Sequence, residues 1–505
     1  MLKTIETILT EHQPFGDSDY IHRRLLVCYQ RRLRKISTYL PVASQLLIAL
    51  NKSPIYKRHQ AIGDTVVRCA IQHALKQLET GTPYGFTLKQ CEEIFRATIH
   101  HLAKDKPGGP LEAGLHRVNR LGTKRYHGWI WSEKHSDDVF GRSFRQLIED
   151  NYGESLCTPT NDEVANLKRG AKLLEYLLPT LSCSALSHSH LIGIFPAVGT
   201  WKGKASSSQF RISGSIFIAR DVLQSPWQVA EYLFHESLHQ KLYDFRHGHS
   251  LLEPNYWRQG APTVCSLWNV PNTSNCWDTH RAVVAFHVYV HLSLLSTVAE
   301  QQEADVVERY EPVQGSLKMI ESRRAFERAH YLGEQIKELC WKELGRAGKG
   351  LIDWLTSVLY VLDPAPPPKD CFLHLLLDLY QRDTQQVEAV LGQADLPSAR
   401  SDFPRQLMDL IDNDVKSTRH LLSAAGAKTV LGRFNNALCR CSDTEFGKKF
   451  SDVRTLILKT LLELSPDGYR LKGSKQHSTN LDEIVKQMIQ ISSRRVDRII
   501  AAYQS

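Results

Sequence analysis

The 505-residue sequence has no long uninterrupted apolar run. A membrane-spanning helix needs roughly 18 or more consecutive apolar residues, and no segment of the sequence reaches that length. Near the start of the chain, Glu6 and Glu11 fall where a secretory signal peptide would be continuously apolar. We therefore expect a soluble, cytoplasmic protein that is not exported and has no membrane partner.

The sequence also lacks a strong charge of either sign. Lys and Arg number 63 against 54 Asp and Glu, a net charge of +9, so we do not expect nucleic acid as a partner. The composition, with 42% hydrophobic and 23% charged residues, excludes disordered and collagen-like chains. One local basic cluster, at residues 23–24 and 31–35, fits a contact with nucleic acid or an acidic peptide, or else a solvated helix face.

No cysteine framework is visible in the sequence. The 11 cysteines are odd in number and scattered, and such scatter in a chain without an export signal favours reduced thiols over disulfides. The close pair Cys439 and Cys441 lacks the Cys-x2-Cys spacing and the second ligand pair of a structural zinc site. We expect buried or incidental thiols.

Helical periodicity runs along most of the chain. Apolar residues recur every three to four positions over residues 25–101 and 163–178, and again in four segments after residue 373. Between these regions, Ile192–Pro196 and the alternating residues Phe210–Ile218 predict short strands, the second of them half-buried. We therefore expect a mainly α fold with a small β-sheet before the central helix, that is, an α+β core with helical flanking domains.

Two breaks in the helical pattern suggest three regions. The segments Lys104–Pro110 and Asp363–Lys369 are too rich in proline and glycine to continue a helix. We predict a helical N-terminal region at residues 1–105, a metal-binding catalytic core at residues 106–362, and a helical C-terminal domain at residues 370–505. The sequence does not indicate the role of this last domain or the oligomeric state.

A short motif in the predicted core signals a metal site. Ser225-Pro-Trp-Gln228 is a capping box with proline at the first helical position, so a helix should run from there to about Phe245 and end near Gly248. This helix contains His235-Glu236-Ser-Leu-His239. Two His four positions apart project from one face and can bind one metal ion, while Glu236 points about 100° around the helix.

No familiar spacing supplies a third ligand. The metzincin pattern fails because Leu242 and Phe245 stand where Gly and His are required, and the gluzincin pattern fails because Ala304 stands where Asp should follow Glu300. For any single His elsewhere, a hydrogen-bonded core residue is as good an interpretation as a ligand. A largely apolar segment nevertheless places three His on one helical face: His280, His287 and His291.

A site with open coordination positions leaves two chemistries. Zinc would polarise a carbonyl with Glu236 as general base, which gives hydrolysis as in a metallopeptidase. Iron(II) would leave positions for a 2-oxo acid and dioxygen, which gives oxidation. Spacing does not separate the two, and a non-catalytic metal-site protein that acts as a binding module is a third hypothesis.

Several segments of the core are similar to the motifs of one family. His235–Leu242 matches the family's HE-x-QH-x-KL element, with Leu238 in place of Gln, and Tyr256–Arg258 matches its P-W-R element, with Tyr256 in place of Pro. Ala285–His287 and Arg323–Ala325 match a Y-A-H element and a later arginine-bearing helix. On these segments, between residues 213 and 362, the chain resembles the HExxH-type 2-oxoglutarate-dependent peptide and amino-acid β-hydroxylases, also described as HExxH peptide-modifying proteins.

The resemblance implies Fe(II) and 2-oxoglutarate as cofactors. The implied reaction is the hydroxylation of an amino-acid side chain, free, carrier-bound or within a peptide, in natural product biosynthesis. The implied metal ligands are His235, His239 and His287, and the match at residues 285–287 is the reason to prefer His287 over His291. Because a guanidinium binds a carboxylate bidentately, an arginine should hold the 2-oxoglutarate. The candidates are Arg258, which the resemblance favours, Arg281 and Arg324.

Overall fold

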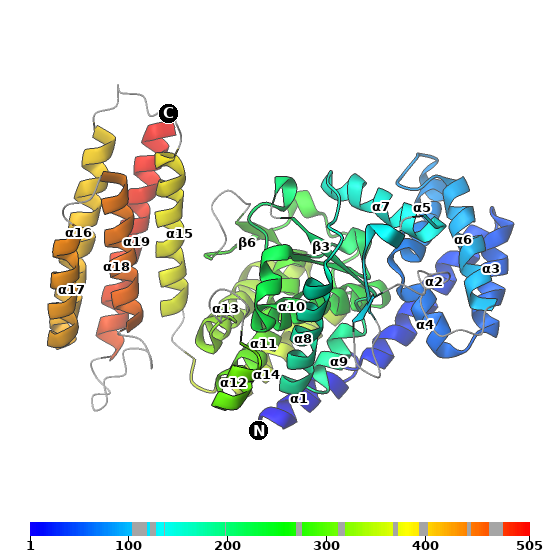
Figure 1. Ribbon diagram of the computed structural model, residues 1–505, viewed down its shortest axis with the longest axis horizontal. Helices are drawn as coiled ribbons and strands as arrows, with labels where there is room; N and C mark the ends of the chain where they lie inside the picture. Colours follow the sequence, from blue (N-terminus) through cyan, green and yellow to red (C-terminus); the bar gives the residue numbers. More distant parts are fainter. Residues whose placement is uncertain are drawn as a thin grey trace. The chain divides into compact units, whose positions relative to one another are not determined.

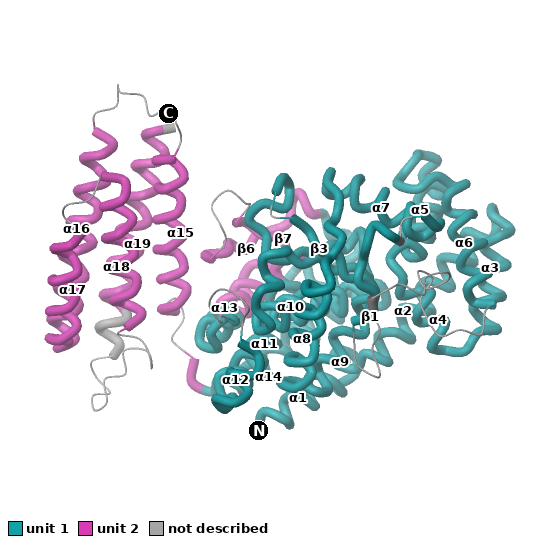
Figure 2. The backbone as a smooth tube through the Cα atoms, in the orientation of Figure 1, with its two compact units in different colours: residues 1–257, 283–329, 341–364 teal, residues 258–282, 330–340, 365–505 magenta. Residues whose placement is uncertain are grey.

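The computed structural model describes residues 1–103, 119–121, 128–135, 137–196, 198–268, 275–311, 319–366, 372–392, 402–441, 446–463 and 478–504. These residues form two compact units, which Figure 2 colours separately. The first unit comprises residues 1–257, 283–329 and 341–364, and the second comprises residues 258–282, 330–340 and 365–505. The break expected at Lys104–Pro110 lies outside the described residues.

The N-terminal helices belong to the first unit together with most of the expected core. They pack with it because α2 lies along α10 (Pro226–Gly248), so both share one interior. Residues 258–282 and 330–340, which we expected inside the core, are grouped with the C-terminal helices instead. The N-terminal helices are α1 (Leu2–Glu11), α2 (Ser18–Ser37), α3 (Pro41–Lys52), α4 (Ile55–Gly63), α5 (Thr65–Thr80) and α6 (Leu88–Ala103).

A mixed five-stranded sheet lies in the first unit, with strand order β1-β2-β3-β5-β4. β3 pairs in parallel with β2 and β5, and β1 and β4 pair antiparallel at the two edges. This small sheet among helices confirms the expected fold class. The strands are β1 (Asn119–Leu121), β2 (Gly128–Ile130), β3 (Leu191–Phe195), β4 (Ser206–Ser207) and β5 (Ser215–Ala219).

The strand predicted over Phe210–Ile218 is wrong in its first half. Phe210–Ile212 forms a 3-10 turn, and β5 begins only at Ser215. Gly214 separates the two, because its φ of 96° is incompatible with a strand and a Cβ there would lie 2.5 Å from the carbonyl oxygen of Gly63. β5 is also buried on both faces, as parallel strands in a covered sheet usually are. The half-buried strand predicted from alternating apolar and polar residues is therefore wrong in its exposed face.

Helix α10 forms as the capping box predicts. The Ser225 side chain accepts a hydrogen bond from the backbone N–H of Gln228, Pro226 occupies the first turn, and the helix ends at Gly248. α10 is buried on almost all sides, since α8, α2, α9 and β5 all pack against it (Figure 1). The further helices that lie wholly or mainly in this unit are α7 (Val139–Tyr152), α8 (Asn161–Leu177), α9 (Leu181–Leu186), α11 (Thr279–Glu300), α12 (Ala304–Arg309), α13 (Ser322–Gln335) and α14 (Arg346–Leu362).

Helix α11 is long and apolar enough to cross a membrane by length and composition alone, with a mean hydropathy of 1.7 over its most apolar window. However, 83% of that window is buried inside the protein. A helix that is apolar all round and enclosed by its own chain is typical of the core of a soluble protein. We therefore treat α11 as a core helix.

The second unit contains a β-hairpin, β6 (Thr263–Cys265) and β7 (Cys276–Asp278), and a helical bundle with its own apolar core. In the bundle, the buried guanidinium of Arg454 donates to Asp414 and Ser492, both at 2.9 Å, and lies 3.7 Å from the ring centre of Tyr380. These contacts join four helices. The bundle helices are α15 (Leu373–Leu391), α16 (Asp402–Ala424), α17 (Lys428–Arg440), α18 (Phe446–Glu463) and α19 (Ser478–Gln504).

Two exposed cysteines meet across the hairpin. Cys265 and Cys276 are register partners on β6 and β7, and their Sγ atoms lie 3.7 Å apart as free thiols. The neighbouring pair Ser266 and Asn275 is hydrogen-bonded, so the cysteines occupy a non-hydrogen-bonded position, where side chains approach most closely. This pair was not predicted, because it depends on the register between β6 and β7.

A buried ion pair connects α5 to α10. Arg68 donates to both carboxylate oxygens of Asp244, at 2.7 and 3.3 Å, and His188 Nδ1 lies 2.7 Å from the same carboxylate. Arg68 and Asp244 are at most 1% exposed. His188 Nε2 lies 3.1 Å from the hydroxyl of Ser18 at the start of α2, so the network joins four segments of the first unit.

We predict that breaking this ion pair destabilises the first unit strongly. Arg68→Met leaves the carboxylate of Asp244 buried without its cation, which should lower the free energy of unfolding by about 3–5 kcal/mol. The double variant Arg68→Met/Asp244→Leu should lose much less than the sum of the single variants, since it leaves no unpaired charge. Calorimetric unfolding of the three variants measures this, and strictly additive losses would contradict the coupling.

A second prediction concerns Asp64, the N-cap of α5. Its carboxylate accepts hydrogen bonds from the N–H groups of Val66 and Val67, yet burial raises its pKa from 3.8 to about 6. The folded protein therefore holds this proton more tightly than the unfolded chain, and the stability contribution is lost as pH rises from about 4 to beyond 6. Asp64→Asn keeps the cap without the charge, so its stability relative to the unmodified protein should rise over that range by roughly 2–3 kcal/mol. Urea unfolding at pH 4.5 and 7.5 tests this, and a pH-independent difference would count against it.

Candidate metal centre

Helix α10 brings the two motif histidines together in the first unit, where both are half-buried. The rings of His235 and His239 lie 4.8 Å apart, and their Nε2 atoms are separated by 3.0 Å. Two nitrogen ligands at about 2.1 Å from one ion span a similar distance. The distance between the two Nε2 atoms therefore suits coordination of one ion by both rings. It also suits a hydrogen bond between the rings.

His235 is held in the neutral form that a metal ligand requires. Burial and, to a smaller extent, the positive charge of Arg328 on α13 lower its pKa to about 4. Neutral imidazole offers a free lone pair, whereas imidazolium does not. The ring can therefore coordinate a cation at neutral pH without first losing a proton.

Glu236 is buried beside this pair. Its Oε1 atom accepts a hydrogen bond from Ser206 on β4 at 2.5 Å and lies 4.0 Å from His235 Nε2. Burial raises the pKa of Glu236 to about 7, although the hydrogen bond from Ser206 works in the opposite direction. Its Oε2 atom is enclosed without a hydrogen-bond partner among the described residues. A buried acceptor of this kind is normally satisfied, which makes a bound cation a fitting partner.

The structure thus gathers two imidazoles and one carboxylate. One ligand atom from each of His235, Glu236 and His239 lies within 4.8 Å of the others. This donor set, two His and one carboxylate, is the one used by non-haem iron sites and by several zinc sites. The residues present therefore fit a mononuclear divalent metal ion.

His287, the third ligand expected from the resemblance, is buried in the same unit but is not a member of this group. Burial lowers the pKa of His287 well below its usual value. Nearby positive charges on His291, Lys241 and His239 lower it in the same direction. Its ring lies 4.4 Å from that of His291, and its Nδ1 atom has no hydrogen-bond partner among the described residues. His287 as a ligand stays a prediction.

The other two histidines of α11 are His291 and His280. His291 Nδ1 bonds the backbone oxygen of His287 at 2.7 Å, whereas its Nε2 atom is buried without a hydrogen-bond partner among the described residues. His280 is half-buried in the first turn of the helix. Unpartnered ring nitrogens therefore do not separate His287 from His291 as a third ligand.

Two of the three expected carboxylate-binding arginines belong to the second unit. Arg258 is 77% exposed and pairs with Asp278 at 2.6 Å. The guanidinium of Arg281 lies 5.0 Å from the ring centre of Trp277, and its backbone N–H donates to the same aspartate. Both are thus engaged within the hairpin region, and their assignment to a co-substrate stays a prediction.

The arginine whose charge acts on the metal motif is Arg328, which was not predicted from the sequence. Arg328 lies one turn after Arg324 on α13, its Nη1 atom donates to the Tyr289 hydroxyl at 3.1 Å, and its charge acts on His235. Arg324 itself is half-buried on the same helix. The spacing of four between these arginines places them on one helical face, which is the signal that would have pointed to Arg328.

A second group of potential ligands, His22, His188 and Asp244, has its ligand atoms within the same 4.8 Å limit. Here, however, Arg68 already occupies both oxygens of the carboxylate and neutralises it. A divalent cation would have to displace that guanidinium. We therefore interpret this group as a structural network, in contrast to the group on α10.

We predict that the metal depends on the α10 pair. His235→Ala and His239→Ala should each lose bound Fe(II) or Zn(II), since one imidazole and a carboxylate neither fill the coordination sphere nor fix its geometry. His280→Ala, on a different helix, is the matched control and should retain the metal. Metal content after anaerobic loading and dialysis gives the answer, and stoichiometric metal in either α10 variant would remove this site from consideration.

Comparisons with known proteins add no assignment. No family model matches the chain, and no curated protein matches it. The resemblance to HExxH-type β-hydroxylases therefore stays a prediction, and the functional argument depends on the residues of this chain.

Proposed function

We propose that this protein is a non-haem iron, 2-oxoglutarate-dependent oxygenase of the cytoplasm that hydroxylates an amino-acid side chain, free, carrier-bound or within a peptide. The observation that carries the proposal is the group of His235, Glu236 and His239 on α10, two half-buried imidazoles beside a buried carboxylate. When bound, the iron would supply dioxygen activation coupled to oxidation of the 2-oxo acid to succinate and carbon dioxide.

The residues of the chain divide the remaining tasks. His235 and His239 would hold the ion, with Glu236 or His287 as the third ligand. Burial excludes bulk water from Glu236, which is 3% exposed, and Ser206 fixes the orientation of its carboxyl group. Such enclosure protects an oxidising site from side reactions with solvent.

Arg328 suits the role of co-substrate anchor. Its guanidinium is oriented by the hydroxyl of Tyr289 at 3.1 Å, and the effect of its charge on His235 indicates proximity to the metal pair. A guanidinium fixed in this way can bind a carboxylate of 2-oxoglutarate with little loss of side-chain entropy. We therefore add Arg328 to Arg258, Arg281 and Arg324 as a candidate for this contact.

One observation favours a second candidate function, a zinc-dependent hydrolase. A general base works best when its pKa lies near the working pH, and burial raises the pKa of Glu236 to about 7. Glu236 would then accept a proton from a zinc-polarised water instead of binding the metal. The same carboxylate thus has different tasks in the two functions.

Glu236→Gln separates the two functions. In a zinc hydrolase the variant should keep its metal and lose peptide cleavage by ~10²-fold or more, because the amide cannot accept the proton. In an oxygenase with Glu236 as ligand it should lose iron, whereas with His287 as ligand it should keep iron and most succinate formation. His287→Ala gives the complementary result.

The assay is succinate formed per oxygen consumed, with Fe(II) and 2-oxoglutarate, compared with cleavage of a peptide library by the zinc-loaded protein. Arg328→Lys should raise the 2-oxoglutarate concentration needed for half-maximal turnover, because an ammonium cannot form the bidentate contact. Zinc retention without any 2-oxo acid turnover in the unmodified protein would reject the oxygenase function.

A further inference from the structure

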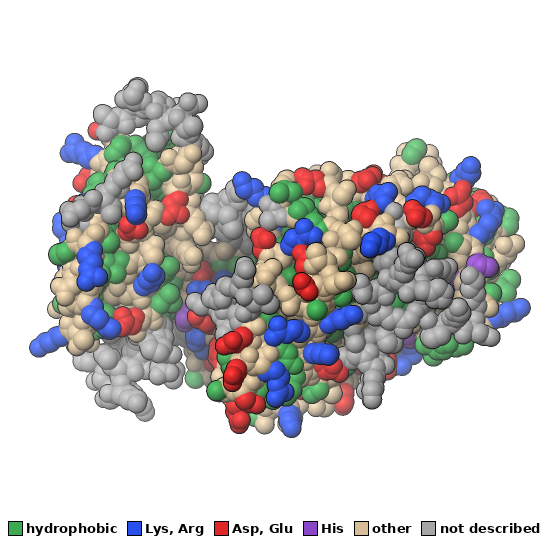
Figure 3. All heavy atoms as spheres, viewed as in Figure 1, with side chains coloured by type: hydrophobic (Ala, Val, Ile, Leu, Met, Phe, Trp, Pro, Cys, Tyr) green, Lys and Arg blue, Asp and Glu red, His purple; other side chains and the backbone are tan. Residues whose placement is uncertain are grey.

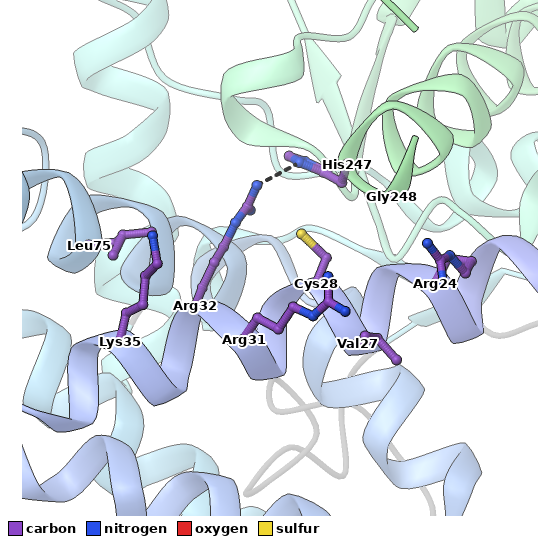
Figure 4. Close-up of a pocket in the computed structure, with 9 residues that line it drawn as sticks. All are labelled: Arg24, Val27, Cys28, Arg31, Arg32, Lys35, Leu75, His247 and Gly248. Carbon is purple, nitrogen blue, oxygen red and sulfur yellow. Dashed lines mark hydrogen bonds between the residues drawn. The ribbon is translucent and has the colours of Figure 1, made fainter. Parts of the chain in front are cut away.

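A pocket on the N-terminal helices has three arginines and a lysine among its nine lining residues. It has a volume of about 320 Å³ and lies between α2 and the C-terminal end of α10, which is contributed by His247 and Gly248. This volume is at the lower end of the range of small-molecule sites. Its lining, which Figure 4 shows, is Arg24, Val27, Cys28, Arg31, Arg32, Lys35, Leu75, His247 and Gly248.

Most positive charges of the pocket have no carboxylate partner among the described residues. Of the four cationic side chains on α2 that line it, only Lys35 pairs with a described carboxylate, that of Glu79 at 3.6 Å. Among the residues that the structure describes, no carboxylate lies within 4.0 Å of Arg24, Arg31 or Arg32. Elsewhere on the face of the first unit that Figure 3 draws, basic and acidic side chains are interspersed.

Concentrating these charges has a cost for α2. Arg31 and Lys35 are four positions apart and Arg32 and Lys35 three, so they repel each other along one face of the helix. The opposite face of α2 is apolar and packs against the rest of the unit. That packing does not require a basic residue at positions 31, 32 and 35. A bound anion would convert this repulsion into attraction.

Arg32 is oriented before any ligand arrives. Its Nη2 atom contacts His247 Nδ1 at 3.2 Å, drawn as the dashed line in Figure 4, and its guanidinium lies 4.8 Å from the ring centre of Tyr29. Its Nη1 atom is buried without a hydrogen-bond partner in the part of the chain that the structure describes. An enclosed guanidinium N–H without an acceptor is rare in folded proteins, and a phosphate oxygen would satisfy it with a charge-assisted hydrogen bond.

The pocket also offers an apolar wall. Val27 is 39% exposed although it is apolar, and Leu75 on α5 is half-buried at the opposite side of the lining. A simple inorganic ion would leave this surface wet. A ligand with a compact organic part would cover it while its charged end contacts the arginines.

We propose that this pocket binds a small organic molecule that carries two or more phosphate groups, such as a nucleoside diphosphate. The phosphates contact Arg24, Arg31 and Arg32, and the organic part lies against Val27 and Leu75. The site is independent of the proposed oxygenase function, since none of its lining residues belongs to the metal group.

Two matched double variants test the site. Arg24→Gln/Arg31→Gln removes two exposed pocket arginines, and Arg23→Gln/Arg34→Gln removes two exposed arginines of the same helix that do not line the pocket. Both change the net charge equally. Calorimetric titration of the full chain with ADP and with tripolyphosphate, at low and high salt, should show at least about tenfold weaker binding in the pocket variant and less than about twofold change in the control.

Three results would overturn the proposal. Equal losses in both variants would mean that the whole basic helix attracts anions without a site. Absence of heat with millimolar ADP and tripolyphosphate in the unmodified protein would mean that the pocket has no affinity for phosphate compounds. Tight binding of a single-stranded RNA oligonucleotide that depends on both arginine pairs, with no small-molecule binding, would assign the surface to nucleic acid.

Discussion

Asp244 places a carboxylate inside the protein, with no exposure to water, and the arrangement of the first unit depends on how that charge is compensated. Arg68 approaches from α5 and His188 from the segment before β3. Desolvating a carboxylate and a guanidinium is costly, and only good geometry with further hydrogen bonds recovers the cost. The position of α10 is therefore fixed relative to α5, α2 and the sheet within narrow limits.

The fixed position of α10 matters because several features of the first unit lie on this one helix. Gln240 bonds the backbone at Gly214 and Ser215 and so aligns the start of β5, while Glu236 reaches Ser206 on β4. At about 1.5 Å per residue, the basic pocket at the end of the helix lies some 12 Å along the axis from His239. Side chains with different tasks are thus held by a single rigid element.

Local signals made part of this structure predictable. The capping box, the proline in the first turn and the spacing of His235 and His239 all act within a few residues, and α10 forms where they place it. The strand over Phe210–Ile218 was predicted from alternation alone, and its first half is wrong because Gly214 has a backbone conformation set by close approach to Gly63. Such approaches depend on tertiary packing.

The long-range parts of the site were not predictable in the same way. Arg328 acts on His235 from a helix more than ninety positions away, and Arg68 is even further from Asp244 in sequence. The choice between Glu236 and His287 as third ligand also depends on long-range packing, because it is set by how α10 and α11 approach each other. The spacing of residues within one helix does not predict the distance between two helices.

The pairing of Arg68 with Asp244 has a consequence for how such a protein can be divided by recombination. A fragment that starts near residue 106 would carry the carboxylate and lack its cation, and the face of α10 that α2 covers would be exposed to solvent. The N-terminal helices and α10 should therefore be inherited as one block. A cut at residues 364–365 would likewise divide a compact unit, since residues 258–282 and 330–340 are grouped with residues 365–505.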